Sequence, residues 1–297
     1  MKIIAGSTHY NLASKLASLL NADLIIPDID RFNDSEYKIR ITENIYGDHV
    51  YIIQSTCKPV NDNLVELLLL VDTAYRAGAA KITTIIPYFG YSRQDHVIDD
   101  YGPSAAQLMT NIIKYAGAGE ILIIDIHTPS IIQHESIYNI DAVNLLTKVM
   151  PDIFNNSSSI IIGPDKGSTS RVQQLSLETR CDFAILDKVR TSDSSCIVSG
   201  NVDVQDKHCI LVDDIASTGI TLYQAVNYLS SNKAASIDIF VTHLISQNSL
   251  DSIMKNSVIR NIYVTDTIVH HHLPNKIHIL SIDLLLVDII KKLNKDF

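Results

Sequence analysis

The sequence predicts an α/β protein with two similar doubly wound, mostly parallel-sheet domains. Two observations support this prediction. Short runs of β-branched residues alternate with segments of helical periodicity, and the alternation restarts after an Asn- and Ser-rich stretch at residues 151–159. We therefore expect an N-terminal domain over residues 1–150 and a C-terminal domain over residues 151–297.

The N-terminal half contains four predicted strands and two predicted helices. Apolar residues at helical spacing predict one helix that starts near Asn61 or Asp62 and runs to Gly78, and a second that follows Pro103 and runs through Tyr115. Strands are predicted at residues 3–4, 50–54, 82–86 and 121–125.

The C-terminal half shows the same alternation without an obvious residue-by-residue repeat. Strands are predicted at residues 160–162, 183–186, 210–212, 237–241 and 259–264, and helices at residues 169–178, 222–229 and 284–293. The last helix is amphipathic and can pack back on the N-terminal domain.

Composition limits the classes of function. With 297 residues and 46% hydrophobic content, the chain can bury a large core. A net charge of −9 gives no general attraction to nucleic acid or to an anionic membrane, so we expect neither as a partner. No apolar run reaches the roughly 18 residues that indicate a membrane span, and the first residues lack a signal-peptide core, so cytoplasmic location is expected.

Cysteine and histidine patterns suggest no structural metal or disulfide framework. The four cysteines are far apart and form no C-x-x-C pair. Three consecutive histidines at residues 270–272 point in different directions, and they are interpreted as an exposed turn before Pro274.

The most informative stretch covers residues 209–222. A buried strand at residues 210–212 is followed by Asp213 and Asp214, then by a hydroxyl-rich turn, then by a helix. Unpaired N–H groups at a helix start suit a phosphate, and hydroxyls in the turn add donors. The acidic pair repels phosphate, so sugar hydroxyls or a divalent metal are its expected partners.

A simpler interpretation of this stretch stays open. A βα junction of any doubly wound protein can carry Asp at the strand end and Ser as a helix cap. Ligands in such sheets bind outside the carboxyl ends of the strands. Polar residues follow several other predicted strands at that edge, at residues 87–95, 125–127, 163–165 and 187–190.

The acidic pair and its turn resemble the phosphoribosyl-binding loop that type I phosphoribosyltransferases share with ribose-phosphate diphosphokinases, also called phosphoribosyl pyrophosphate synthetases. Further motifs resemble the second family alone: Arg31-Phe-Asn-Asp-Ser-Glu36, Gln54-Ser-Thr56 followed by Asn61-Asp-Asn-Leu-Val-Glu66, and residues 87–95. This resemblance covers nearly the whole chain. It implies the type I phosphoribosyltransferase-like fold in both domains.

The resemblance implies transfer of a diphosphoryl group from ATP to the anomeric hydroxyl of ribose 5-phosphate, which gives phosphoribosyl pyrophosphate and AMP. Lys188 and Arg190 match the family's catalytic Lys-x-Arg positions, where cations brace phosphoryl oxygens. His127 and Asp165 match the magnesium-associated positions, so Mg²⁺ is the implied cofactor.

The same resemblance assigns two substrate sites. The ATP-binding residues are Phe32, Asp34, Glu36, Arg93, Gln94 and Asp95, and the ribose-5-phosphate-binding residues are Asp213, Asp214, Ser217, Thr218, Gly219 and Thr221. Neither a P-loop nor a dinucleotide fingerprint is present, so ATP would be held without them.

The chain departs from the family pattern at three places. Residues 96–101 are acidic where many members are basic, which puts phosphate or nucleotide inhibition through that loop in doubt. Residues 128–135 differ from the family's usual continuation. Ser217 replaces a common Asp, and Ile220 stands where Gly is usual, so we expect a differently shaped turn because a β-branched residue resists positive φ.

Two alternatives remain. A type I phosphoribosyltransferase would explain the loop but not the N-terminal motifs, and a non-catalytic regulatory nucleotide-binding subunit would be expected to have lost the loop cations or metal residues. The resemblance also implies a homo-oligomer, either a dimer or multiples of dimers.

Overall fold

The computed structural model describes residues 1–297 except 95–101, 130–133, 155–157, 193–194, 201 and 295–297, and it leaves the side chains of residues 188–199 undescribed. The chain forms two compact units. The N-terminal unit comprises residues 1–140, 267–269 and 283–297, and the C-terminal unit comprises residues 141–266 and 270–282. The chain therefore first passes between units after Ile140, not after residue 150, because residues 141–150 pack with the second unit.

The N-terminal unit is built on a six-stranded parallel sheet with the order β2-β1-β5-β6-β7-β8. The strands are β1 (Lys2–Ala5), β2 (Asp23–Ile25), β5 (His49–Ile53), β6 (Lys81–Ile86), β7 (Glu120–Ile124) and β8 (Ile137–Ile140). The central strands are almost wholly buried, as a parallel sheet covered on both faces requires.

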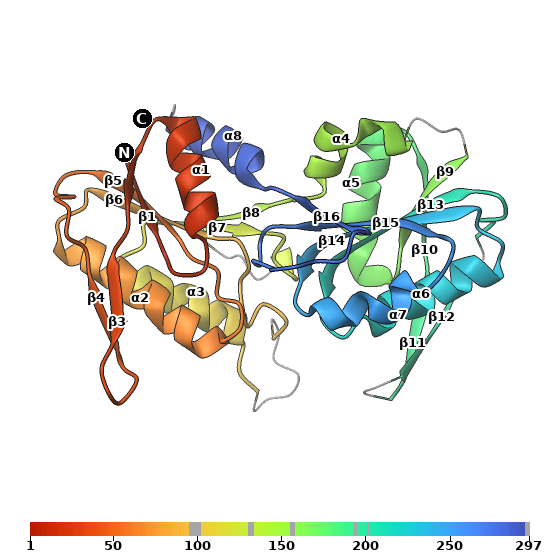
Figure 1. The fold of residues 1–297 in the computed structure, drawn as a ribbon, viewed down its shortest axis with the longest axis horizontal. Coiled ribbons are helices and arrows are strands. Elements are labelled where there is room, and N and C mark those ends of the chain that lie inside the picture. The colour runs from red at the N-terminus through yellow and green to blue at the C-terminus, as the bar shows by residue number, and fades with distance from the viewer. Residues whose placement is uncertain (95–101, 130–133, 155–157, 193–194, 201, 295–297) are drawn as a thin grey trace. The chain divides into compact units, whose positions relative to one another are not determined.

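Helices cover both faces of this sheet. In Figure 1, α1 (Tyr10–Leu20) and α8 (Asp283–Leu293) lie on one face, and α2 (Val60–Arg76) and α3 (Ala105–Tyr115) lie on the other. Helix α2 buries Leu67, Leu70 and Val71 at helical spacing. Helix α8 belongs to the N-terminal unit, where its Asp283 lies 3.7 Å from Lys15 of α1.

The C-terminal unit repeats this plan with a parallel sheet of order β10-β9-β13-β14-β15-β16. Its strands are β9 (Ser159–Gly163), β10 (Asp182–Ile185), β13 (His208–Ala216), β14 (Ser236–Leu244), β15 (Ile259–Thr265) and β16 (Ile277–Leu280). In Figure 1, α4 (Asn144–Val149) and α5 (Thr169–Thr179) lie on one face, and α6 (Ile220–Ser231) and α7 (Asp251–Met254) lie on the other. Short 3₁₀ turns occur at Pro151–Phe154, Lys166–Ser168 and Gln247–Leu250.

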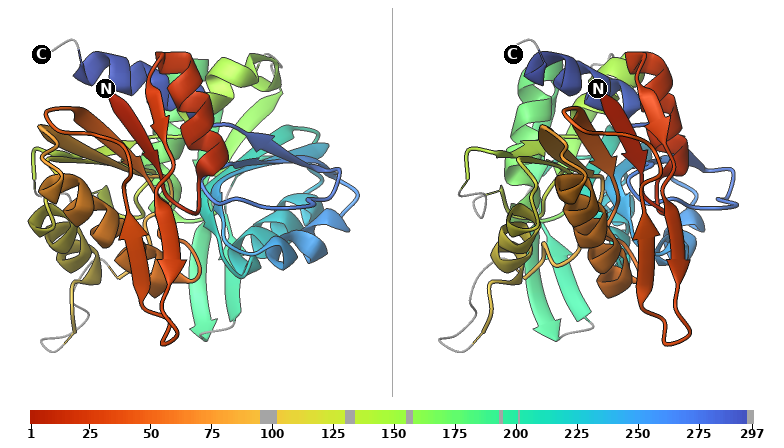
Figure 2. Two further views of the ribbon diagram at one scale, coloured as in Figure 1. Left: turned by 60° about the vertical axis from the view of Figure 1, so that its left-hand side comes forward. Right: turned by 90° about the vertical axis from the view of Figure 1, so that its left-hand side faces the viewer.

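Each unit also carries an antiparallel hairpin at the same point of its topology. Hairpin β3 (Asp28–Arg31) and β4 (Tyr37–Arg40) follows β2, and hairpin β11 (Asp187–Ser192) and β12 (Ser195–Ser199) follows β10. Figure 2 shows both hairpins extending beyond the sheets of their own units. In the N-terminal unit β2 and β5 lie on opposite sides of β1, so the switch point of the sheet is between β1 and β5. In the C-terminal unit β10 and β13 lie on opposite sides of β9, so the switch point is between β9 and β13. The predicted fold of two similar parallel-sheet domains is thus confirmed.

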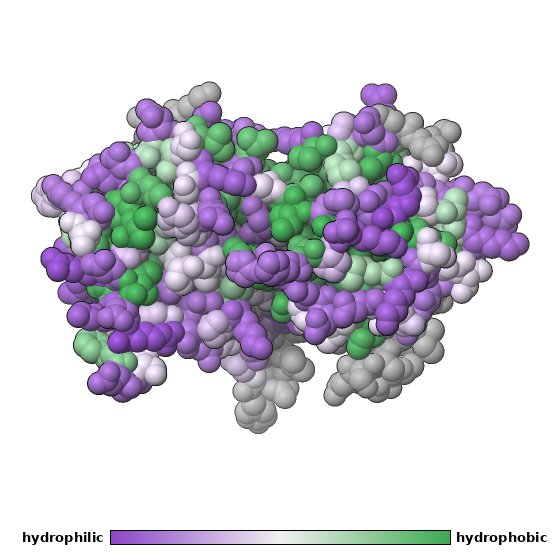
Figure 3. All heavy atoms as spheres, viewed as in Figure 1, coloured by the Kyte–Doolittle hydropathy of each residue, from purple (hydrophilic) through white to green (hydrophobic). Residues whose placement is uncertain are grey.

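On the face drawn in Figure 3, apolar side chains form small patches separated by polar ones. Within the described ranges, no helix is long and apolar enough to cross a membrane. Cytoplasmic location stays a prediction.

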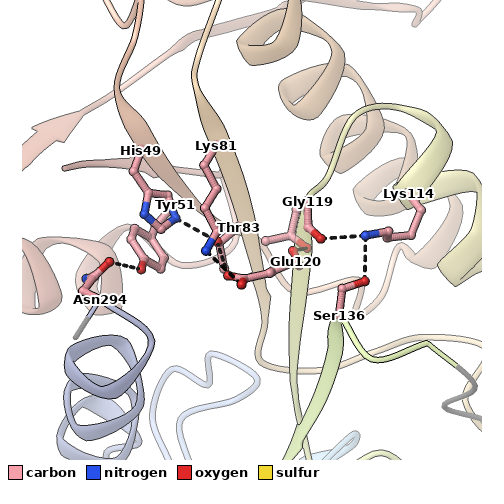
Figure 4. Close-up of polar contacts among 10 residues, drawn as sticks. His49, Tyr51, Lys81, Thr83, Lys114, Gly119, Glu120, Ser136 and Asn294 are labelled. Atoms are coloured by element: carbon pink, nitrogen blue, oxygen red, sulfur yellow. Dashed lines mark hydrogen bonds and ion pairs between the residues drawn. The ribbon is translucent and has the colours of Figure 1, made fainter. Parts of the chain in front are cut away.

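A polar network connects the amino ends of three strands in the N-terminal unit (Figure 4). The Thr83 hydroxyl donates to Glu120 Oε2 at 3.0 Å, and its oxygen lies 2.9 Å from His49 Nε2. Lys81 Nζ pairs with Glu120 Oε1 at 2.8 Å. Because the threonine hydroxyl is used as a donor, His49 Nε2 must carry the proton that it shares with that oxygen.

The same network reaches Asn294, the residue that follows α8 by one position. The Tyr51 hydroxyl, beside the stacked His49 ring, donates to Asn294 Oδ1 at 3.1 Å (Figure 4). Burial and the nearby Lys81 cation lower the pKa of His49 from 6.5 to about 4. The neutral imidazole is therefore part of the folded network.

We expect the stability of the protein to fall as the pH drops from about 6.5 to about 4, in part through His49. In this window the unfolded histidine binds a proton that the folded one resists, so the free energy of unfolding decreases. The His49→Asn variant should show a smaller loss of Tm between about pH 7 and about pH 4.5 than the wild type. The exposed His134→Asn variant should keep the wild-type loss; an unchanged loss in His49→Asn would contradict the assignment.

Candidate functional site

The acidic pair lies inside β13 rather than after it. The predicted strand at residues 210–212 continues to Ala216, because β13 stays paired with β14 through Ala216↔Leu244. Asp213 and Asp214 therefore occupy the carboxyl end of a central strand. This end adjoins the switch point between β9 and β13, where ligands bind in doubly wound sheets.

Burial and, after it, electrostatic repulsion disfavour the charged form of the Asp213 carboxylate. Asp214 is buried, and Asp213 Oδ1 accepts a hydrogen bond from the Asp214 N–H at 3.0 Å. Burial raises the pKa of Asp213 well above its ordinary value, and the charges of Asp214 and Asp165 raise it further. A ligand that offers hydroxyl donors or positive charge would relieve this cost.

Arg171 supplies the opposing charge, and no sequence motif singles it out. It lies in the first turn of α5, and its Nη2 is 3.9 Å from Asp214 Oδ2. The Arg171 and Asp214 side chains are only 14% and 10% exposed, and Arg171 lowers the pKa of Asp213. The one available signal was its position, six residues after Asp165 on the following helix.

The predicted metal residue Asp165 sits in the turn between β9 and α5. Its Oδ1 accepts the Gly167 N–H at 2.9 Å, and its carbonyl accepts the Ser168 hydroxyl at 2.6 Å. A Cβ on Gly163 would lie 2.3 Å from Ser168 Oγ, so glycine is needed for this close approach. The turn thereby fixes the Asp165 carboxylate near the strand end.

The predicted phosphate loop joins β13 to α6. Gly219 has φ +75° and precedes Ile220, the first residue of the helix. The position that needs a positive φ is therefore a glycine, and the expected difficulty at Ile220 does not arise. A Cβ on Gly219 would also lie 1.9 Å from the Ser249 carbonyl oxygen. Ser217 and Thr221 are half-buried, and Thr218 is exposed.

The corresponding switch point of the N-terminal unit is filled by its own side chains. The buried Glu66 carboxylate accepts from the Ser7 N–H at 2.8 Å and from the Ser7 hydroxyl at 2.7 Å. The buried Gln54 Oε1 accepts from the Thr8 hydroxyl at 2.8 Å. A carboxylate thus occupies the loop donors that could otherwise hold an anion at this switch point.

The first group of predicted ATP residues lies on the β3–β4 hairpin. Phe32, Asp34 and Glu36 are all exposed, and the Phe32 side chain retains 54% of its accessible surface. An exposed aromatic ring flanked by carboxylates is suited to cover a base and accept from its amino group.

The second group follows β6. Tyr91 has φ +67°, and its hydroxyl donates to Asn61 Oδ1 of α2. The Gln94 N–H donates to the Tyr91 carbonyl at 3.0 Å. Arg93 and Gln94 are exposed, and Asp95 lies outside the described residues.

The predicted metal residue His127 is exposed in the turn after β7. Asp125, two residues earlier, has φ +40°, and the Ile126 N–H donates to Asn139 Oδ1 of β8 at 2.8 Å. His127 belongs to the N-terminal unit and Asp165 to the C-terminal unit. In the part of the chain that the structure describes, no group of three or more His, Cys, Asp or Glu residues could hold a metal ion.

The predicted catalytic cations lie on β11. Lys188 is in register with Val198 and Arg190 with Cys196 on β12, and their side chains lie outside the described residues. The structure thus groups Asp165, Arg171, Asp213 and Asp214 in one unit. The ATP residues that it describes and His127 belong to the other unit.

Comparisons with known proteins match both halves of the chain. Residues 1–117 match the N-terminal domain of ribose phosphate pyrophosphokinase, and residues 133–272 match the phosphoribosyl transferase domain. The ribose-phosphate pyrophosphokinase of Thermotoga maritima is 34% identical over 306 residues, which cover 99% of this chain and 95% of the relative. The ribose-phosphate pyrophosphokinase of Maricaulis maris is 35% identical over an alignment that covers 100% of this chain and 97% of the relative.

A solved structure agrees with these matches. Phosphoribosylpyrophosphate synthetase from Mycobacterium smegmatis superimposes with a TM-score of 0.90 and 28% identity, over 100% of this chain and 99% of the other. The resemblance inferred from the motifs is confirmed. The chain belongs to the ribose-phosphate pyrophosphokinase family.

Proposed function

We propose that the protein transfers the diphosphoryl group of ATP to the anomeric hydroxyl of ribose 5-phosphate, giving phosphoribosyl pyrophosphate and AMP. The observation that carries this proposal is the acidic pair, half-buried Asp213 and buried Asp214, beside the glycine-dependent turn before α6 at the C-terminal switch point. Membership of the family over the full chain supports it.

The C-terminal unit is proposed to bind ribose 5-phosphate. Asp213 and Asp214 would accept hydrogen bonds from the sugar hydroxyls, which relieve the repulsion between the two carboxylates. Ser217, Thr218, Gly219 and Thr221 would hold the phosphate through backbone N–H groups and hydroxyls at the start of α6.

The N-terminal unit is proposed to bind ATP. Phe32 would cover the adenine, and Asp34 and Glu36 would accept from its amino group. Arg93, Gln94 and Asp95 are assigned to the same nucleotide, with the Arg93 guanidinium directed to phosphate oxygens.

Mg²⁺ is proposed as the cofactor. Mg²⁺ prefers oxygen ligands and usually keeps several waters, so a few carboxylates and the substrate phosphates can hold it. Burial raises the pKa of Asp213, and the charges of Asp214 and Asp165 raise it further, so a divalent cation here would offset a local excess of negative charge. Asp165 and His127 are the residues assigned to it, and the ion would supply neutralisation of the polyphosphate charge.

The chain's own residues would position and stabilise the transfer. The anomeric oxygen forms a bond to the β-phosphorus, the bond from that phosphorus to the α-phosphate oxygen breaks, AMP leaves with its electron pair, and the hydroxyl proton passes to solvent. Lys188 and Arg190 are assigned to brace the β-phosphoryl oxygens while charge moves between them.

The alternatives are less well supported. A type I phosphoribosyltransferase leaves the N-terminal unit unexplained, whereas the matched relatives span it. A non-catalytic regulatory subunit would be favoured by intact ATP binding without turnover. We also propose a cytoplasmic homo-oligomer, a dimer or multiples of dimers, which sedimentation would test.

The decisive experiment incubates the protein with ATP, Mg²⁺ and ribose 5-phosphate. AMP and phosphoribosyl pyrophosphate should appear in equal amounts. Formation of ADP instead would exclude diphosphoryl transfer, and absence of turnover with intact ATP binding would favour the regulatory subunit.

We expect the Lys188→Ala variant to lose turnover while it keeps nucleotide binding. A cation that stabilises charge only during transfer should affect kcat by about 100-fold and the Kd for ATP by less than about threefold. Steady-state kinetics and calorimetry measure the two quantities. Equal losses in both would identify Lys188 as a simple binding residue.

We expect the Gly219→Ala variant to raise the KM for ribose 5-phosphate by about tenfold or more, because the added methyl group meets the Ser249 carbonyl and displaces the loop. Gly47→Ala is the matched control: Gly47 has nearly the same φ, +76°, but nothing lies within 4 Å of its Cβ position. Gly47→Ala should leave this KM unchanged. An equal KM for ribose 5-phosphate in the two variants would contradict the assignment of the loop before α6 to the phosphate.

A further inference from the structure

The tip of the β3–β4 hairpin contains a strained residue. The Ser35 N–H donates to the Phe32 carbonyl and the Phe32 N–H donates to the Glu36 carbonyl, each at 2.9 Å, so the turn is tight. Ser35 closes it with φ +74°. A turn followed by one left-handed residue is the bulged hairpin connection in which glycine is usual, because a side chain disfavours positive φ.

Arg31 holds the strained residue in place. Its Nη1 donates to the Ser35 carbonyl at 3.0 Å, across the base of the turn. Its Nη2 donates to the Tyr37 hydroxyl at 2.7 Å, and the guanidinium carbon lies 4.0 Å from the centroid of the Tyr37 ring. One planar group therefore contacts both arms of the hairpin, a geometry that the single ammonium of lysine cannot reproduce.

The same guanidinium attaches the hairpin to a helix. Arg31 Nη2 lies 2.8 Å from Asp62 Oδ2 in the first turn of α2. Asp62, one of the two residues that the sequence suggested as a helix cap, lies inside the helix, whose N-cap is Pro59, and its carboxylate pairs with Arg31. The two side chains are 40% and 44% exposed, so the ion pair alone contributes little to stability. The pair instead fixes the position of the hairpin relative to α2.

We infer that Arg31 is a positioning residue for nucleotide binding, which replaces the missing glycine by fixing the Ser35 carbonyl and anchoring the turn to α2. The three residues that the turn presents are Phe32, Asp34 and Glu36. The inference rests on the proposed function in assigning these three side chains to ATP. It adds a residue that contacts no substrate itself but sets the arrangement of those that do.

The test measures binding of a non-hydrolysable ATP analogue with Mg²⁺ to the full chain by calorimetry, and the KM values for ATP and for ribose 5-phosphate. Arg31→Gln should weaken nucleotide binding and raise the KM for ATP by about tenfold, the effect of losing a hydrogen bond to a charged group. Arg31→Lys should show a similar loss. The KM for ribose 5-phosphate should not change.

The informative variant is Ser35→Gly. Glycine adopts the positive φ without strain, so Ser35→Gly should bind nucleotide at least as well as the wild type, and Arg31→Gln combined with Ser35→Gly should recover most of the lost affinity. Arg40→Gln removes the same charge from the far end of β4 and should leave binding unchanged. A purely structural or long-range electrostatic role would not produce this rescue.

Three outcomes overturn the inference. These are unchanged nucleotide affinity in Arg31→Gln, an equal loss in Arg40→Gln, and absence of rescue by Ser35→Gly in a double variant whose Tm matches the wild type. Failure of the proposed function looks different, because the wild-type protein itself would then bind no ATP analogue or release ADP instead of AMP.

Discussion

The C-terminal unit depends on tolerating two adjacent carboxylates at the buried end of a central strand. Because β13 stays paired with β14 as far as Ala216, Asp213 and Asp214 lie near the carboxyl end of this central strand. There burial and mutual repulsion raise the pKa of Asp213. Arg171 offsets part of this cost from α5. A ligand can offset the rest of this free-energy cost, because hydroxyl donors or a cation beside the pair stabilise the charged carboxylates.

The two units show how one topology is used in two ways. In the C-terminal unit the loop after β13 leads into α6 through Gly219, and the Ile220 N–H donates to Thr218 Oγ1 at 3.5 Å. In the N-terminal unit the Glu66 carboxylate binds the Ser7 donors at the equivalent switch point, and Gln54 binds Thr8. The same sheet order therefore carries the proposed phosphate loop in one unit, while the other unit carries its proposed nucleotide residues on a hairpin and on loops after its strands.

Sequence reasoning predicted the central strands, because β-branched runs that are buried on both faces are recognisable without tertiary context. It also placed a turn and a helix start directly after the acidic pair, where the structure has Gly219 and α6. It missed Arg171 and the true length of β13, since both depend on neighbours distant in sequence. It placed the domain boundary after residue 150 because a polar stretch resembles a linker. It did not detect the two hairpins, because strands of four to six residues are too short for periodicity to distinguish them from loops.

Each unit carries its hairpin in the connection that crosses from one side of its first strand to the other. This connection contributes no strand to the main sheet, so its length and side chains can change without shifting the register of any sheet pair. The proposed substrate-binding residues of the hairpins can therefore change without altering the two sheets. A descendant of this protein could acquire a new base preference or a new set of phosphate-facing cations by exchanging a segment of about a dozen residues, while both cores stay the same.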